Sequence, residues 1–197
     1  EELPGGIGFT PLAIDGSPLI PGSTAKRIDE LAGSLNSPVT IAIIGSTTGS
    51  REGTAMAIAQ RTGRPLVRID IERCQQYLEQ PWDLLRELRL SRALPYLINL
   101  SSTQDEPAVR LQVVALGSAL ATLSYPILVG GSDRRTMSGL LGSERPNLTV
   151  QVGRTDYTER LDAWQKILGE REWDVGKAEE IAERFYSVGG TTLDHIL

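Results

Sequence analysis

The chain of 197 residues is long enough for one domain, or for one domain with a small appendage, and too short for a multidomain machine. Hydrophobic residues make up 40% of it and charged residues 23%, which excludes wholesale disorder. Twenty Lys and Arg against 25 Asp and Glu give a net charge of −5, without the basic excess typical of nucleic-acid-binding proteins. On this ground we expect no nucleic-acid partner.

One cysteine and one histidine limit the chemistry further. Cys74 has no second cysteine to pair with, so a disulfide framework is excluded, and His195 is the only imidazole available for a metal site or a catalytic triad. No apolar run approaches the roughly 20 residues of a membrane span, so we expect no membrane partner. These features favour a reducing, cytoplasmic compartment. The chain begins with Glu1 rather than Met, which indicates a fragment or a processed product.

The first 22 residues carry four prolines and five glycines with no helical period, which predicts an irregular N-terminal arm or linker. Ser23 and Thr24 can cap a helix that continues to about Leu35. Beyond it, short apolar runs alternate with amphipathic ones, and the three tryptophans are expected to fill gaps between helices and sheet. The pattern predicts strands at 39–44, 65–70, 94–100, 126–130 and 148–152, and helices at 54–62, 82–90 and 109–123.

Alternating strands and helices at this spacing predict an α/β fold, a parallel sheet covered by helices on both faces. The strand at 39–44 is apolar throughout, so we expect it near the centre of the sheet. After residue 153 the period becomes helical, with helices predicted at 157–168, 175–185 and 191–197. We therefore expect an arm at 1–22, an α/β domain at 23–153 and a small helical part at 154–197.

The turn after strand 39–44 has the spacing of a phosphate-binding loop. In such a loop, glycines let backbone N–H groups approach the phosphates, a Lys reaches the β- and γ-phosphates, and a Ser or Thr hydroxyl binds Mg²⁺. The slots G-x-x-x-x-G-K-[ST] fall on Gly45-Ser46-Thr47-Thr48-Gly49-Ser50-Arg51-Glu52. The first Gly is retained, whereas Ser50 replaces the second Gly, Arg51 replaces the Lys, and Glu52 replaces the hydroxyl residue.

From residue 45 onward the chain resembles an AAA+ ATPase module of the P-loop NTPase superfamily. The loop, the alanine-rich helix after it and the segment Gly63-Arg-Pro-Leu-Val-Arg-Ile-Asp70 carry the resemblance, and residues 178–197 resemble the end of the family's helical lid. The resemblance covers roughly residues 23–197. It implies a three-layer parallel sheet of P-loop NTPase type at 23–153 and a truncated C-terminal helical lid at 154–197.

The motifs that serve hydrolysis in this family are degenerate here. Asn99 and Leu100 stand where the family ends its Walker B strand with Asp-Glu, so the Mg²⁺-side carboxylate and the water-activating Glu are missing. Ser132 stands near the position of a polar sensor residue. Arg134 and Arg135 follow it, either as an arginine finger toward a neighbouring subunit or as part of a solvated loop.

Glu52 places a carboxylate next to the expected triphosphate, where like charges about 4 Å apart repel by several kcal/mol at a partly buried site. We expect Glu52 in the first turn of the helix, taking the place of a phosphate, with Arg51 pairing with it or swinging outward. The candidate cofactor site is a vestigial phosphate loop with two residues from neighbouring strand ends. It consists of Gly45, Thr48, Gly49, Ser50, Arg51, Glu52, Asn99 and Ser132, with no catalytic and no metal-ligating residue.

The favoured hypothesis is a catalytically degenerate AAA+ module. By resemblance, it acts in ring assembly, partner docking or regulation of a larger ATP-dependent cytoplasmic protein, with protein partners and self-association through the parent chain. No cofactor is expected beyond weak binding of ATP or ADP.

Two alternatives stay open. One is an active ATPase with an atypical Walker A loop, in which Arg51 replaces the Lys and Asp70 supplies a carboxylate at the neighbouring strand end. The other is a pure protein-interaction domain that has kept the fold and lost its ligand.

Overall fold

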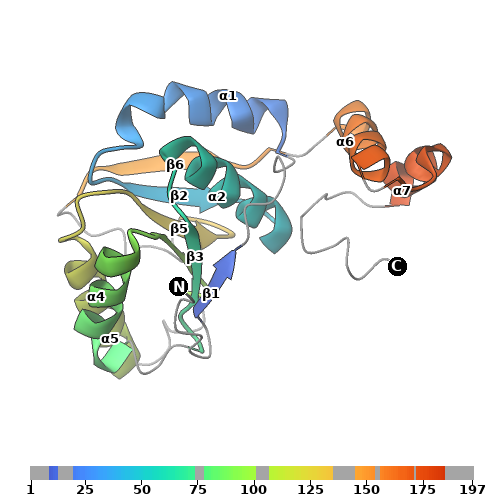
Figure 1. Cartoon of the computed structure of the whole chain (residues 1–197). Helices are drawn as coiled ribbons and strands as arrows, with labels where there is room; N and C mark the ends of the chain where they lie inside the picture. Colours follow the sequence, from blue (N-terminus) through green and yellow to red (C-terminus); the bar gives the residue numbers. More distant parts are fainter. Residues whose placement is uncertain are drawn as a thin grey trace.

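A computed structural model describes residues 9–12, 20–73, 78–100, 107–134, 145–153, 156–170 and 172–184 of the chain (Figure 1). Strands and helices alternate from β2 to β5, as the sequence predicts. The elements are, in order, β1 (Phe9–Leu12), α1 (Gly22–Glu30), η1 (Ala32–Ser34), β2 (Thr40–Ile44), α2 (Thr48–Thr62), β3 (Leu66–Asp70), α4 (Pro81–Ser91), β4 (Leu94–Ile98), α5 (Pro107–Leu120), β5 (Ile127–Gly131), β6 (Asn147–Gln151), α6 (Tyr157–Glu170), η4 (Val175–Lys177) and α7 (Ala178–Arg184).

The described strands form one six-stranded sheet in the order β1-β3-β4-β5-β2-β6. The five strands from β2 to β6 are mutually parallel, which confirms the predicted parallel α/β sheet. β2 pairs with β5 on one side and with β6 on the other, so it lies beside the middle strand of the parallel five rather than in the middle. The carboxyl ends of β2, β3, β4 and β5 therefore meet at one edge of the sheet.

The segment 1–22 differs from the irregular arm expected, because four of its residues form β1. This strand pairs antiparallel with β3, with Phe9 opposite Ile69 and Leu12 opposite Leu66. The pairing satisfies the N–H and C=O groups that β3 would otherwise expose at the sheet edge. Pro11 is compatible with an edge strand because only one side of the strand is hydrogen-bonded. Four residues bracketed by prolines and glycines give too short a pattern to predict.

The sheet is covered on both faces (Figure 1). The crossover through α2 runs from β2 toward β3, whereas those through α4 and α5 run along the sheet in the opposite direction. Because such crossovers are right-handed, α2 lies on one face and α4 and α5 lie on the other. α1 contacts α2 and β6 and so joins the layer of α2. This is the three-layer arrangement that the sequence predicts.

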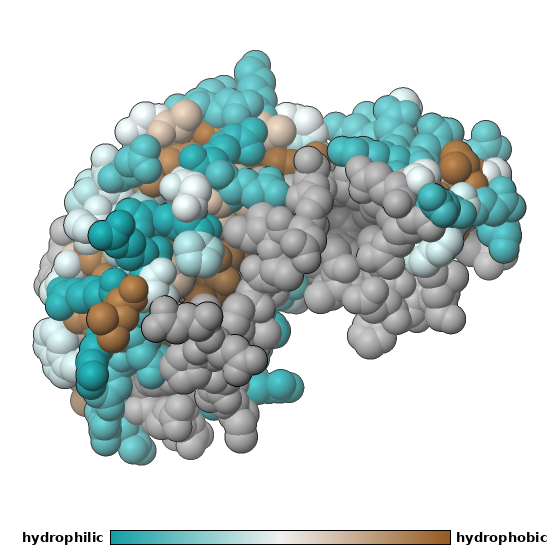
Figure 2. Space-filling view, viewed as in Figure 1, coloured by the Kyte–Doolittle hydropathy of each residue, from teal (hydrophilic) through white to brown (hydrophobic). Residues whose placement is uncertain are grey.

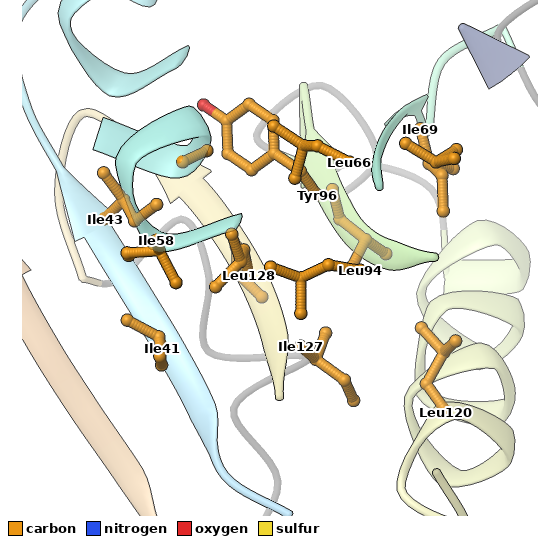
Figure 3. Close-up of a cluster of buried hydrophobic side chains, with 14 of the residues drawn as sticks. Ile41, Ile43, Ile58, Leu66, Ile69, Leu94, Tyr96, Leu120, Ile127 and Leu128 are labelled. Carbon is orange, nitrogen blue, oxygen red and sulfur yellow. The ribbon is translucent and has the colours of Figure 1, made fainter. Parts of the chain in front are cut away.

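The described core consists of two separate clusters. The larger lies between the sheet and its helices, and Figure 3 shows part of it, where Ile43, Leu128 and Tyr96 point toward α2 and its Ile58. The smaller joins α6 to α7 through Trp164, Leu168, Ala178 and Ala182. We call α6, η4 and α7 the lid. Of the three tryptophans, only Trp164 is fully buried, and Trp82 on α4 is 65% exposed, so the expectation that it fills a gap is wrong.

Most helix limits agree with the sequence to within a few residues. α2 ends where predicted, with Gly63 as a left-handed cap at φ 63°. The helix expected to reach Leu35 ends at Glu30 and continues as the short η1 turn. The helix predicted at 191–197 lies outside the described residues. None of the helices in the described part of the chain combines the length and the apolar character that crossing a membrane requires.

Gly130 in β5 leaves room for the ring of Tyr96 in β4. A Cβ atom at Gly130 would lie 2.8 Å from Tyr96 Cε2 and 2.9 Å from Cζ, closer than such atoms approach. We predict that Gly130→Ala lowers the free energy of unfolding by about 1–3 kcal/mol, because the packed core must shift. Urea denaturation measures this. The control is Gly33→Ala, where a Cβ meets nothing within 4 Å, so its free energy of unfolding should not fall. Equal losses in both variants would contradict the prediction.

Candidate functional site

The loop after β2 is shorter than the sequence predicts. α2 begins at Thr48, not at residue 54, and Thr47 caps it: the Ser50 N–H donates to Thr47 Oγ1 at 3.3 Å. Only Gly45, Ser46 and Thr47 separate the strand from the helix. Among the described glycines, Gly63 alone has a positive φ, so neither Gly45 nor Gly49 takes the left-handed conformation expected of a phosphate loop. The segment 45–52 has the spacing of a phosphate-binding loop, but its backbone does not have the conformation of one.

Arg51 folds back over this short loop. Its guanidinium donates from Nη1 to the Gly45 carbonyl at 2.5 Å and from Nη2 to Thr48 Oγ1 at 3.1 Å. The stem covers Gly45 closely, because a Cβ there would lie 3.2 Å from Arg51 Cγ and 3.0 Å from Val152 Cβ. Gly45 thus leaves room for the close approach of the side chains of Arg51 and Val152. The expectation that Arg51 could swing outward is therefore wrong, because its guanidinium is held by Gly45 and Thr48.

Glu52 is directed away from the loop. It lies in the second turn of α2, is buried, and its Oε1 lies 3.0 Å from Nε of Arg68 on β3. The sequence analysis placed this carboxylate in the first turn, in the place of a phosphate. That expectation is wrong because the helix begins earlier and β3 supplies a cation on the face that α2 covers.

Tyr96 completes a buried group of polar side chains beneath the start of α2. Its ring is buried, and Figure 3 shows the hydroxyl directed toward α2. Burial raises the pKa of Tyr96 far above its ordinary value of 10, and the charge of Glu52 adds to this, while Arg51 and Arg68 oppose it. The phenol therefore stays protonated. We call the buried Glu52 and Tyr96, together with the half-buried Arg51 and Arg68, the polar cluster.

The sequence contains one signal for this cluster, the polar residues within two apolar strands. Arg68 and Tyr96 interrupt otherwise apolar strands at positions that alternate with buried leucines and isoleucines, so both had to face a helix layer. What joins them to Glu52 and Arg51 is the strand order, which brings β3 and β4 under α2. No pattern along the chain gives that neighbourhood.

A second polar group lies at the carboxyl ends of β3 and β4. Asn99 takes a left-handed conformation at φ 58°, and its amide donates to Asp70 Oδ2 at 3.0 Å. Asp70 is buried and also accepts the Glu72 N–H at 3.2 Å, with Arg73 Nε at 3.7 Å. Its carboxylate is therefore engaged by the chain itself. Among the described residues, no three His, Cys, Asp or Glu side chains gather as a metal site would need.

The remaining predicted site residues lie at the surface. Ser132 and Arg134 follow β5 and are exposed, so the structure brings Ser132 to the same sheet edge as Asn99 without burying it. Thr48 is exposed, while Gly49 and Ser50 are half-buried in the first turn of α2. Arg135 lies outside the described residues.

The pair between Glu52 and Arg68 is expected to stabilise the fold. We predict that Glu52→Ala lowers the free energy of unfolding by about 1–3 kcal/mol, because Arg68 loses the buried carboxylate with which it is paired. The matched control is Asp29→Ala, which breaks the exposed pair with Arg61 and should cost under about 1 kcal/mol. Urea denaturation of both variants measures the difference. Similar losses would show that the cluster is not a buried network.

Comparison with known proteins gives relatives only among solved structures. No family model and no curated protein matches the chain. A replication initiator DnaA bound to AMPPCP and single-stranded DNA is similar, with TM-score 0.59 and 14% identity over 93% of this chain and 61% of that one. Domain III of the Thermotoga maritima DnaA gives 0.55 and 12% over 84% and 78%. A DNA replication initiation factor gives 0.54 and 14% over 87% and 57%.

The expectation of no nucleic-acid partner is corrected by the first of these structures. That DnaA is bound to single-stranded DNA, so a protein with this fold can have a nucleic-acid partner. The expectation was wrong in its reasoning, because net charge gives the sum over the surface and not the charge of any one face. A net charge of −5 is compatible with a local basic surface.

The architecture and the comparisons agree. Five parallel strands carry helices on both faces, and a small helical lid follows the sheet. The similar structures cover most of this chain at identities of 12–14%, a level at which they establish the fold alone. The chain therefore has the α/β fold of a P-loop NTPase of the AAA+ type, as its resemblance to that family implies.

Proposed function

We propose that this chain is a non-hydrolysing AAA+-type module that serves assembly, docking or regulation in a larger ATP-dependent protein. The observation that carries the proposal is the guanidinium of Arg51 on the Gly45 carbonyl. A phosphate loop turns backbone N–H groups toward its ligand, whereas here a side chain of α2 covers the loop and uses one of its carbonyl groups. Binding of a triphosphate would require this contact to break.

The residues around the loop do not fit a magnesium nucleotide. Glu52 occupies the slot of the Mg²⁺-binding hydroxyl and is paired with Arg68. Asn99 occupies the slot of the Walker B carboxylate and donates to Asp70. Phosphoryl transfer relies on a metal clamp and on a group that orients water. At these two described positions, neither Glu52 nor Asn99 is available for those functions. We derive no hydrolytic step for this chain.

The active-ATPase alternative needs Asp70 as the missing carboxylate. Asp70 is buried and engaged by Asn99 and by the Glu72 N–H, so the chain would have to release it first. The alternative of a pure interaction domain, like our proposal, expects no hydrolysis, so a measurement with nucleotide separates both of them from the active-ATPase alternative. The similar DnaA binds AMPPCP, which makes direct measurement with nucleotide the deciding experiment.

We predict that Mg²⁺-ATP leaves the melting temperature of the chain unchanged and that phosphate release equals the blank. A ligand at a hundred times its Kd would stabilise the fold by about 2.7 kcal/mol, which is readily seen as a shift in melting temperature. Differential scanning fluorimetry with ATP, ADP and AMPPCP, and a phosphate-release assay, test this.

The matched variant is Arg51→Ala, which removes the guanidinium from the loop. If wild-type protein bound ATP and Arg51→Ala did not, Arg51 would be a phosphate ligand and the proposal would fail. If only Arg51→Ala bound nucleotide, the covering role of Arg51 would be supported directly.

A further inference from the structure

The outward face of α5 lacks the charges that a solvent-facing helix normally carries. Of the 14 residues of α5 only Arg110 is charged. One side of the helix is buried against the sheet, yet on the other side Leu111 is 72% exposed and Val114 is 46% exposed. A helix that is apolar on both sides is normally covered on both. The outward face of α5 therefore has the composition of an interface.

One side of the neighbouring helix α4 borders this face. Arg89 donates to Thr122, just beyond the end of α5, at 2.9 Å, so Arg89 marks the side of α4 that lies toward α5. Around the helix, Trp82 lies within about 20° of Arg89 and Arg86 within about 60°. Trp82 is 65% exposed, and Figure 2 shows exposed hydrophobic residues at the lower left, where Figure 1 places α4 and α5.

The carboxylates of these two helices lie elsewhere. α5 has none, and α4 has two, Asp83 and Glu87. They lie about 120° and about 160° from Arg89 around the helix, on the side away from α5. The side toward α5 thus combines apolar and cationic side chains on a chain whose net charge is −5. We define the α4/α5 face as Trp82, Arg86, Arg89, Leu111 and Val114.

The charge of this face restricts what can cover it. Opposite potentials across an interface favour binding and like charges oppose it, so the arginines select carboxylates and disfavour the same face of a second copy. A nucleic acid would leave the α5 part of the face, Leu111 and Val114, without a phosphate contact, because phosphates are held by cations. A partner that covers the whole face needs apolar side chains bordered by carboxylates.

The small residues of α5 indicate the shape of that partner. Ala108 and Ala115 are exposed on the same helix as Leu111, so another backbone can come close to α5 there. Packed helices have axes about 8–10 Å apart, at the short end where the side chains between them are small. A third helix, lying beside α4 and α5 as those two lie beside each other, fits this surface.

We propose that the α4/α5 face binds an acidic amphipathic helix of another protein. Its apolar side chains contact Trp82 and Leu111, and its carboxylates pair with Arg86 and Arg89. Such a helix is recognised through apolar anchors that recur every three or four residues. The inference rests on the proposed docking role and specifies the class of partner. The face includes no residue of the loop after β2, so binding requires no nucleotide.

Fluorescence anisotropy with synthetic probes, on the full chain and without nucleotide, tests the proposal. The first probe is a labelled helix of about 20 residues, about 30 Å long, with leucines on one face and glutamates along both borders. It is expected to bind with a Kd of about micromolar order, and more weakly as salt is raised, because the paired charges are screened. The same helix with lysines in place of the glutamates, and an oligothymidylate, are the matched probes and should bind at least about tenfold more weakly.

Two variants locate the binding site. Leu111→Glu and Arg86→Glu should each raise the Kd of the acidic helix at least about tenfold. The matched controls are Val175→Glu, which places the same carboxylate at an exposed apolar position of the lid, and Lys26→Glu, which reverses an exposed charge on α1. Both controls should bind like wild type. Circular dichroism of each variant shows that it is folded, so loss of binding is not loss of structure.

Three results would overturn the inference. They are absence of binding by the acidic helix at about millimolar concentration, equal binding of the lysine helix, and binding that persists in both Leu111→Glu and Arg86→Glu. Tighter binding of the oligothymidylate, lost in Arg86→Glu, would overturn it in favour of a nucleic-acid partner. ATP hydrolysis by a chain that still binds the acidic helix would overturn the proposed function alone. A chain that neither hydrolyses ATP nor binds the helix would overturn this inference alone.

Discussion

The contact between the Arg51 guanidinium and the Gly45 carbonyl decides what the sheet edge can do. It forms because α2 begins immediately after Thr47 and so places Arg51 one turn into the helix, within reach of the strand it has just left. Gly45 permits the contact, since any Cβ would meet the stem of Arg51 and Val152. The start of α2, where a phosphate-binding loop would hold its anion, is thereby covered by the guanidinium of Arg51.

The cation requires a polar environment, and the sheet below supplies it. A charge taken out of water is tolerated only when it is paired or hydrogen-bonded. Arg68 is paired with the carboxylate of Glu52, and Arg51, Arg68 and Glu52 all lie near the phenol of Tyr96. Tyr96 reaches this position because Gly130 on the next strand has no side chain. A substitution of Arg51 or of Glu52 would therefore also change the charges around Tyr96.

The exposed side chains differ between the layer of α4 and α5 and the lid. The layer of α4 and α5 carries exposed apolar side chains and arginines, whereas the lid carries exposed carboxylates.

The sequence by itself determined the α/β class, five of the six strands, the parallel sheet and most helix limits, because apolar period and capping residues are local signals. It also identified Arg51, Glu52 and Asn99 as the departures from the family's motif. It did not predict β1, because the four residues Phe9–Leu12 form a strand only by pairing with the open edge of β3. Only the tertiary structure paired Glu52 with Arg68 and placed Tyr96 beneath α2, because those neighbours come from the strand order β3-β4-β5-β2, which no spacing along the chain encodes.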